Sequence, residues 1–316
     1  MDKNRAPRIT IVGSFMTDLM SRSPRLPSPG ETVMGGPFKM GPGGKGTNQA
    51  VTAARLGAEV NIVASLGNDE FGNMAYDTLS KEGIGVGFVK RVDGVSTGAA
   101  LIIVDDSGGE NMIVVAPGSN SFLGVDDVER AREVIESSDC VVMQLEIPLP
   151  TVEYCAALAH GAGARVVLDP APAPNKPLGD ELLHFVDVLT PNENEASLIS
   201  GIEVTDLASA EQAARSLVNR GCGTVIITMG SSGVLAFDGN EVLHVPAFNV
   251  KAVDTTGAGD AFNGALAVSL AEAKDLHEAC VFASAVAGIS VTRIGTSVAI
   301  PHREEVCEFL RGKHLS

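Results

Sequence analysis

Residues 253–267 read VDTTGAGDAFNGALA, a turn of small residues that runs directly into an apolar, alanine-rich helical pattern. Asp254 and Asp260 lie on either side of this turn. An aspartate near a helix N-terminus accepts backbone N–H bonds and is favoured by the helix dipole, which explains one of the two acids. It does not explain Gly257 and Gly259, whose missing side chains let another chemical group approach the backbone closely.

The same turn has the residues that phosphoryl transfer requires. Successive N–H groups of Gly257, Ala258 and Gly259 at a helix start form an anion hole for a phosphoryl group. Asp260, beside them, is placed to take a proton from a hydroxyl group as its oxygen attacks phosphorus. We therefore predict that Asp260 is a general base and that the three preceding residues stabilise the developing charge.

Away from this turn, the sequence alternates between short β-branched runs and helical periods. Six apolar runs are expected as strands: 9–13, 60–67, 140–146, 165–171, 186–192 and 224–230. Helical patterns lie at 46–57, 69–82, 126–137, 149–161, 193–200 and 207–220, and a run of helices closes the chain from 257 to 310. Near-continuous apolar strands are typical of a parallel sheet covered on both faces. The sequence predicts an α/β, doubly wound fold with a mostly parallel sheet flanked by helices.

Two segments break this alternation. Residues 21–44 are rich in Pro and Gly, and residues 97–118 have the pattern of two strands around a DDSGGE turn. We expect a small β-sheet built from about 15–44 and 97–118, within one domain that spans 1–316. A sheet hinged at Gly43 and Gly44 would act as a lid, and an ordinary surface hairpin is the alternative.

The glycine-rich stretch GPGGKG (41–46) fails both standard nucleotide motifs. A dinucleotide fingerprint would follow the first strand directly, and here the glycines come some 30 residues later. A P-loop would place Ser or Thr after Lys45, which is followed by Gly46. What remains is a helix start that presents Lys45 and Asn48, suited to a hydroxylated or anionic ligand.

Composition limits the class of protein. The chain has 316 residues, a net charge of −16 and no block of basic residues, so nucleic acid and anionic membranes are not expected as partners. Its five cysteines are scattered without C-x-x-C spacing, which favours reduced thiols. The N-terminus lacks the apolar stretch of a signal peptide, and no run reaches the roughly 18 apolar residues of a membrane span. We expect a cytoplasmic protein.

GGKGTNQAVTAARLG (43–57) and DTTGAGDAFNGALA (254–267) resemble the two signature segments of the ribokinase-like (PfkB) family of carbohydrate kinases. The resemblance continues in order through GSFMTD, QLEIP, the DPAPA loop, TPNENE, ITMGSSG and VTRIGT. It implies transfer of phosphate from ATP to the terminal hydroxyl of a sugar, in a cleft between the α/β body and a β lid. GSFMTD, GGKGTNQ and QLE favour a pentose, so the resemblance implies D-ribose as substrate and ribose 5-phosphate as product.

The resemblance assigns roles residue by residue. Asp260 would be the base on the sugar's terminal hydroxyl. The residues expected at the sugar are Met16, Asp18, Gly44, Lys45, Asn48, Glu146 and Asp260, and those at ATP are Asn192, Thr228, Gly230, Gly233, Gly259 and Ser284. Asn192 and Glu195 match an N-x-x-E element, with Glu195 acting on Mg²⁺ largely through water.

A monovalent cation site, usually for K⁺, is also implied. The matching residues are Asp254, Thr256, Val291, Ile294, Gly295 and Ala299. Ala299 stands where the family often has a serine hydroxyl, and the site survives this change if carbonyl oxygens and Asp254 dominate.

Met16 leaves more than one sugar possible as the substrate. Many ribokinases place asparagine at this position, whereas members that accept 2-deoxyribose, and some ribokinases, resemble this chain in having methionine. Alternatives are therefore a 2-deoxyribose kinase, another sugar or nucleoside kinase of the family, or a sugar sensor without catalysis. Exposed edges of a lid sheet would be covered by pairing two subunits, which predicts a homodimer.

Overall fold

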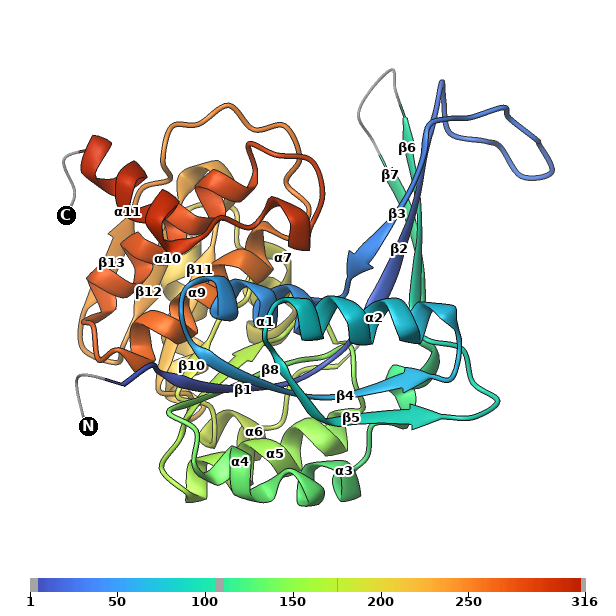
Figure 1. Cartoon of the computed structure of the whole chain (residues 1–316). Helices are drawn as coiled ribbons and strands as arrows, with labels where there is room; N and C mark the ends of the chain where they lie inside the picture. The colour runs from blue at the N-terminus through green and yellow to red at the C-terminus, as the bar shows by residue number, and fades with distance from the viewer. Residues whose placement is uncertain (1–4, 106–110, 175, 314–316) are drawn as a thin grey trace.

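The computed structural model describes residues 5–105, 111–174 and 176–313, which form two sheets and the helices around them (Figure 1). In these residues the larger sheet has nine strands, in the order β13 (Val242–Val245), β12 (Val234–Phe237), β11 (Thr224–Thr228), β10 (Val188–Leu189), β9 (Arg165–Asp169), β8 (Cys140–Gln144), β1 (Arg8–Val12), β4 (Glu59–Gly67) and β5 (Gly85–Val92). All neighbours from β11 to β5 pair in parallel, and β12 and β13 add two antiparallel strands at one edge. The predicted doubly wound α/β fold is confirmed.

Helices cover both faces of this sheet because its strands are apolar on both sides. One face carries α1 (Lys45–Arg55), α2 (Glu70–Lys81), α9 (Ala258–Ala271), α10 (Leu276–Ser290) and α11 (Arg303–Gly312). The other carries α3 (Val125–Arg130), α4 (Arg132–Glu136), α5 (Leu149–Gly161), α6 (Asp180–His184), α7 (Glu193–Ser200) and α8 (Leu207–Asn219). Ile9 and Ile11 of β1 belong to the first core, and Val12 belongs to the second. Successive side chains of a strand point to opposite faces, so β1 contributes to both cores.

The predicted strands are present, and the sequence missed four elements. β5, β12, β13 and the short α6 were not expected, and the helix predicted over 126–137 is divided into α3 and α4 at Ala131. β5 reads GVGFVKRV, in which Gly and basic residues interrupt the apolar pattern. It lies at the edge of the sheet, where one side needs no strand partner, so burial of its side chains is incomplete.

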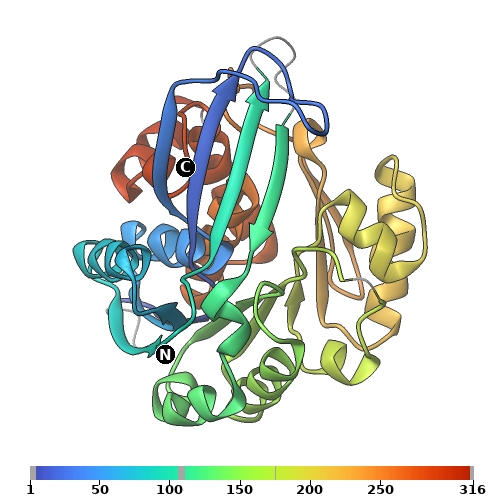
Figure 2. The same ribbon diagram turned by 90° about the vertical axis from the view of Figure 1, so that its right-hand side faces the viewer.

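A separate small sheet projects from the body (Figure 1), and Figure 2 shows its strands side by side. Its strands are β3 (Phe38–Gly43), β2 (Met16–Ser23), β6 (Ala99–Asp105) and β7 (Asn111–Ala116), in that order. β2 and β6 pair in parallel, and the outer pairs are antiparallel. Residues 106–110 of the expected DDSGGE turn lie outside the described residues. Across the described ranges, every helix is too short or too polar to span a bilayer.

Candidate active site

The site lies where the strand order of the large sheet reverses. β1 stands between β4, which follows it in the chain, and β8, which begins the second half. In such sheets ligands bind in the crevice beyond the carboxyl ends of the strands at this reversal. Ser14, just after β1, donates a hydrogen bond to Glu146, just after β8. The backbone N–H of Lys45 donates to the same carboxylate at 3.0 Å, which fixes the start of α1 over the crevice.

Asp260 is buried in the first turn of α9 and is held by side chains of α1. Asn48 Nδ2 donates to Asp260 Oδ2 at 2.8 Å, and Gln49 Nε2 donates to Oδ1 at 3.4 Å. Lys45 Nζ lies 3.8 Å from Oδ1. The signature segments, more than 200 residues apart in the chain, thus meet at one carboxylate.

Lys45 gathers a cluster of acids. Four carboxylates interact with its ammonium group: those of Asp169, Asp260, Glu146 and Glu195. Burial disfavours the charged ammonium, but these carboxylates outweigh burial and raise the pKa of Lys45 above its ordinary value. Burial raises the pKa of Asp169 to about 7, although the charge of Lys45 opposes the shift. Lys45 is therefore a fixed positive charge in an acidic crevice.

Asp18 connects the small sheet to this crevice. It lies on β2 and accepts a hydrogen bond from Thr296 Oγ1 at 3.3 Å. Burial raises the pKa of Asp18 to about 6. The hydrogen bond from Thr296 opposes this shift, and the negative charges of Glu146, Asp260 and Asp254 add to it. A Cβ atom on Gly43 would collide with the Asp18 carboxylate. Only glycine therefore lets β3 pass this close to the acid.

Met16 and Gly44 lie at the base of the small sheet. Gly44 has a φ of +89° and presses against the backbone of residues 15 and 16, so a side chain there would be strained and would clash. Met16 is buried, and its sulfur lies 3.6 Å from Asn120 Nδ2. Gly98 packs against the same sulfur. The thioether is thus held between Asn120 and Gly98, and Met16 is not among the residues that line either cavity described below.

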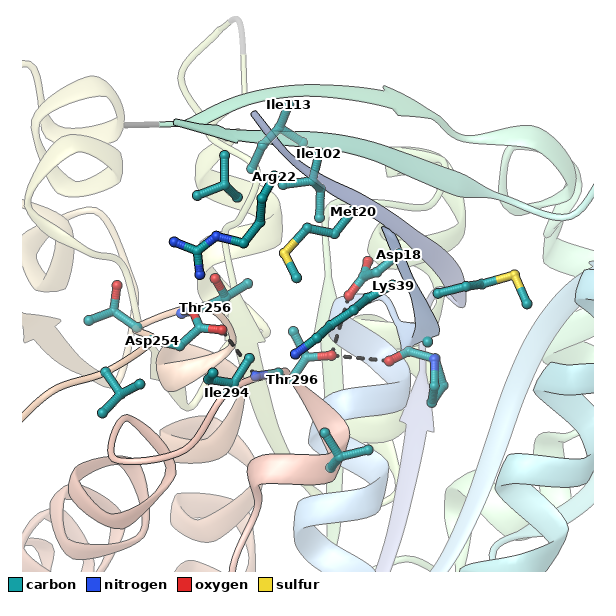
Figure 3. Close-up of a pocket in the computed structure, with 18 of the residues that line it drawn as sticks. Asp18, Met20, Arg22, Lys39, Ile102, Ile113, Asp254, Thr256, Ile294 and Thr296 are labelled. Atoms are coloured by element: carbon teal, nitrogen blue, oxygen red, sulfur yellow. Dashed lines mark hydrogen bonds between the residues drawn. The ribbon is translucent and has the colours of Figure 1, made fainter. Parts of the chain in front are cut away.

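A cavity of about 640 Å³ lies between the small sheet and the body (Figure 3). Asp18, Met20 and Arg22 line it from β2, and Ile102 and Ile113 line it from β6 and β7. On the body side it is lined by residues 252–256 and by 294–296. It joins two of the predicted groups, Asp18 for the sugar and Asp254, Thr256, Ile294 and Gly295 for the cation.

A second cavity, of about 370 Å³, lies on the other side of the turn. It collects five of the six residues expected at ATP: Thr228, Gly230, Gly233, Gly259 and Ser284. The sixth, Asn192, forms a β-bridge with Thr228. Ser284 is buried, and its hydroxyl has no hydrogen-bond partner in the described part of the chain. Both cavities share Ala252 and Thr255, so the turn before Asp260 separates them.

The glycine turn has the expected form with one difference. Gly257 is the N-cap of α9 with a φ of +77°, and a Cβ on Gly259 would meet open space. The N–H of Ala258 donates to Thr255 O at 3.2 Å within the turn itself. The N–H groups of Gly259 and Asp260 belong to the first helical turn, where no intrahelical acceptor exists. The N–H groups of Gly259 and Asp260, rather than that of Ala258, are therefore available to bind an anion.

Asn192 and Glu195 cap α7. Asn192 Oδ1 accepts from the N–H of Glu195, and Glu195 Oε2 accepts from the N–H of Asn192, each at 2.9 Å. Glu195 is also close enough to Lys45 and Asp260 to interact with both, and burial raises its pKa. In the described ranges no cluster of three His, Cys, Asp or Glu residues could enclose a metal ion. A single carboxylate beside a phosphate site suits Mg²⁺, which keeps most of its waters.

The expected cation residues form two facing loops joined by Asp254. Its carboxylate accepts from the N–H of Thr256 and from the N–H of Gly295, each at 3.0 Å. Val291 O accepts from the N–H groups of residues 253 and 254, at 2.7 and 3.1 Å. Both lone pairs of this carbonyl are therefore engaged, which leaves it less suited to a cation than the sequence implied. The other loop carbonyls and Asp254 are hard oxygen donors of the kind that a K⁺ ion prefers.

Sequence reasoning missed three residues around Asp260: Gln49, Asp169 and Ser297. Gln49 follows Asn48 in the quoted signature segment, and Asp169 lies within the predicted strand 165–171, where it ends β9 at the carboxyl edge of the sheet. These two positions in the sequence could have identified Gln49 and Asp169 as candidates for the site. Ser297 lies next to the VTRIGT segment, 249 residues from its partner Asn48, and nothing local marks it.

The chain is similar in sequence to proteins of a known kinase family. The model of the pfkB family carbohydrate kinases matches residues 6–303. The chain is 43% identical over 302 residues to a ribokinase of Haemophilus influenzae, covering 96% of this chain and 98% of that protein. It is 38% identical over 302 residues to a deoxyribokinase of Salmonella typhi, with the same two coverages.

A solved structure extends the likeness to three dimensions. Arabidopsis thaliana ribokinase complexed with ribose and ATP superimposes with a TM-score of 0.89 at 31% identity, covering 97% of this chain and 99% of that one. The matched model spans both signature segments and every residue that surrounds Asp260. This chain belongs to the pfkB family of carbohydrate kinases.

Proposed function

We propose that this protein transfers the γ-phosphoryl group of ATP to the 5-hydroxyl group of D-ribose, giving ribose 5-phosphate and ADP. The observation that carries the proposal is the buried Asp260 carboxylate, which follows a glycine turn whose preceding residues border two cavities. Full-length similarity to proteins named ribokinase supports ribose as the sugar. The neighbour complexed with ribose and ATP supports the pair of substrates.

The chemistry assigns each group one task. The 5-oxygen of ribose bonds to the γ-phosphorus as the bond from that phosphorus to ADP breaks, and the hydroxyl proton passes to Asp260. The N–H groups of Gly259 and Asp260, at the positive end of the α9 dipole, stabilise charge on the phosphoryl oxygens. Lys45 adds positive charge at the same place. Such transfer depends on positioning and charge neutralisation, which this crevice provides.

The sugar would lie between the small sheet and α1. Asp18 and Glu146 supply carboxylate acceptors for its hydroxyl groups, and Lys45 and Asn48 supply donors. Gly44 lets the ring approach the backbone. This set of acceptors and donors suits a polyol. Its assignment to a single site is supported because Lys45 and Asn48 both lie at Asp260, Glu146 accepts from the N–H of Lys45, and the charges of Glu146 and Asp260 act on Asp18.

Mg²⁺ and K⁺ are the cofactors we assign. Mg²⁺ would neutralise negative charge on the phosphates of ATP, and Glu195 would hold it through water. K⁺ would be held by Asp254 and the carbonyl oxygens of the two loops, with Ala299 contributing no side-chain ligand. Rates in K⁺, Na⁺ and tetramethylammonium test the second assignment, because activation by K⁺ alone supports it and equal rates in all three remove it.

The decisive test of the reaction is ADP release over a panel of sugars at saturating Mg·ATP. Ribose should give the highest kcat/KM, and the product should be ribose 5-phosphate. A sugar sensor would bind ribose by calorimetry without ADP release, and preference for 2-deoxyribose would reassign the enzyme to the alternative activity.

The outer face of the small sheet supports a homodimer. Ile102 and Ile113 form a pair that faces the cavity, so the neighbouring pair, Leu101 and Val114, faces away from it. Leu101 is 49% exposed and Val114 65% exposed. A second copy of the sheet would cover these apolar pairs. The cytoplasm remains our assignment for the compartment, supported by five cysteines that are all free thiols.

A further inference from the structure

Asp260 is held by two amide side chains that can each be oriented in two ways. Asn48 and Gln49 follow one another on α1, and each directs its NH₂ group to a different oxygen of the carboxylate. Rotating either amide by 180° would direct its carbonyl oxygen at the negative charge instead. The orientation of a side-chain amide is set by whatever bonds its other end. The groups behind the two amides therefore decide how Asp260 is held.

Gln49 is fixed by two buried residues at the ends of neighbouring strands. Its Nε2 donates to Asp169 Oδ2 at 2.8 Å as well as to Asp260, and its Oε1 accepts from Gln144 Nε2 at 2.6 Å. Asp169 and Gln144 end β9 and β8, and both are buried. An ionised carboxylate only accepts, and the charge of Lys45 favours the ionised form of Asp169, which then requires the NH₂ group of Gln49 on its side.

Asn48 is fixed from the opposite side of the site. Ser297, in the short helix η3 (Ser297–Ala299), donates its hydroxyl proton to Asn48 Oδ1 at 2.6 Å. Arg55 binds the backbone carbonyls of Ser297 and Ile300, at 2.9 and 2.7 Å, and holds this segment against α1. The Ser297 hydroxyl therefore keeps the Asn48 carbonyl oxygen away from Asp260.

We infer that Asp169 and Ser297 are positioning residues for phosphoryl transfer: they fix the amides of Gln49 and Asn48 so that both donate to the Asp260 carboxylate. Neither residue needs to touch the sugar or ATP for this role. The inference rests on the proposed role of Asp260 as base. It predicts a loss in kcat, because a base that is misdirected still leaves substrate binding largely intact.

Two pairs of variants, one pair for each of the two residues, test the inference. Asp169→Leu and Ser297→Ala remove the oxygen that holds the amide, while Asp169→Asn and Ser297→Thr keep an oxygen there. We expect the first variant of each pair to lose about 10- to 100-fold in kcat, the usual effect of leaving a buried polar group without its partner. The conservative variants should retain kcat within about threefold, and the Kd of ribose should change less than kcat throughout.

Coupling separates positioning from general damage. If Asp169 acts through Gln49, Asp169→Leu combined with Gln49→Met should lose no more activity than Gln49→Met alone. Circular dichroism checks that each variant folds, and the Ser297 pair, which alters the fewest atoms, tests the inference even if Asp169→Leu does not fold.

Three outcomes would overturn the inference. The first is an unchanged kcat in both Ser297→Ala and Asp169→Leu, and the second is a loss of kcat in the conservative variants as large as in their partners. The third is a double variant that loses the activity of both single variants combined. Wild-type protein that releases no ADP with any sugar would instead refute the proposed function, so the two failures are distinguishable.

Discussion

The Asp260 carboxylate and the small β2-β3-β6-β7 sheet differ in how far the rest of the chain covers them. Asp260 is buried, and α1 supplies hydrogen-bond donors to both of its oxygens. The small sheet has apolar pairs on both faces, one toward a cavity and one toward the outside. The Asp260 carboxylate is thus held by residues of one chain, while the sheet exposes surface that a sugar on one side and a second subunit on the other would cover.

This difference explains why phosphoryl transfer and substrate closure can be assigned to separate parts of the molecule. Preorganised groups stabilise charge without rearranging during the reaction, and a body with a buried network provides them. A sheet that projects from the body can move or pair without disturbing that network. Substitutions in the two regions should therefore have different signatures, chemistry in one and assembly or sugar binding in the other.

The largest effect is expected at the base itself. Asp260→Asn should fold normally and lose phosphorylation by roughly 10² to 10⁴-fold or more, because a positioned general base contributes that much. ADP release and calorimetric binding of ribose measure the two properties separately. Asp275, which caps α10 by accepting from the N–H of Glu278 at 2.8 Å, provides a matched control as Asp275→Asn. Near-wild-type turnover in Asp260→Asn with intact ribose binding would mean that another group is the base.

The outer face of the small sheet should respond in assembly. Leu101→Lys places a charge among the exposed apolar pairs, so the dimer should dissociate at least about 10-fold more readily, measured by sedimentation equilibrium. Leu198→Lys is the matched control, because Leu198 on α7 is similarly exposed at 57% but lies away from this sheet. A monomeric wild-type protein, or equal effects of the two substitutions, would remove the sheet as the interface.

How much the sequence predicts differs between the same two regions. The parallel strands and most helices follow from apolar periodicity, because burial on both faces dictates their residue types. β5 and β13 were missed, since they are edge strands that are only partly buried and carry a weaker pattern. β12 was missed for another reason: it is buried between β11 and β13 but has only four residues, VLAF. At the site, both ends of the Asn48–Asp260 contact were predicted from motifs. Ser297 was not, because a supporting hydrogen bond between distant residues leaves no local pattern. Asp169 was also missed, although its position at the carboxyl end of β9 was an available signal.

Met16 tests how the site reads the sugar's 2-position. A thioether cannot replace the donors and strong acceptor of an amide, so 2-deoxyribose should be phosphorylated with a kcat/KM within roughly 10² of that for ribose. Met16→Asn should raise this ratio by about 10-fold or more, while Met20→Asn, on the same strand face, should not. A wild-type ratio above about 10⁴ that Met16→Asn leaves unchanged would show that Asp18 or Lys45 reads this hydroxyl instead.

The smallest effect concerns the pH dependence of sugar binding through Asp18. Its pKa is raised from 3.8 to about 6, chiefly by burial, so the folded protein binds a proton that the unfolded chain releases between these values. The contribution of Asp18 to the free energy of unfolding therefore falls as pH rises from about 4 to 6. Protonation also removes a carboxylate acceptor from the sugar site.

The Kd of ribose should accordingly increase as pH falls below about 6, by up to about 10-fold per pH unit, and be nearly constant above about 7. Calorimetry from pH 5 to 8 measures this directly, without interference from the protonation of Asp260 during turnover. Asp18→Asn should bind ribose more weakly at neutral pH and lose the dependence, whereas Asp169→Asn should keep it. If Asp18→Asn retained the full pH dependence, another carboxyl group at the crevice, with Glu146 the nearest choice, would be the one that ribose requires ionised.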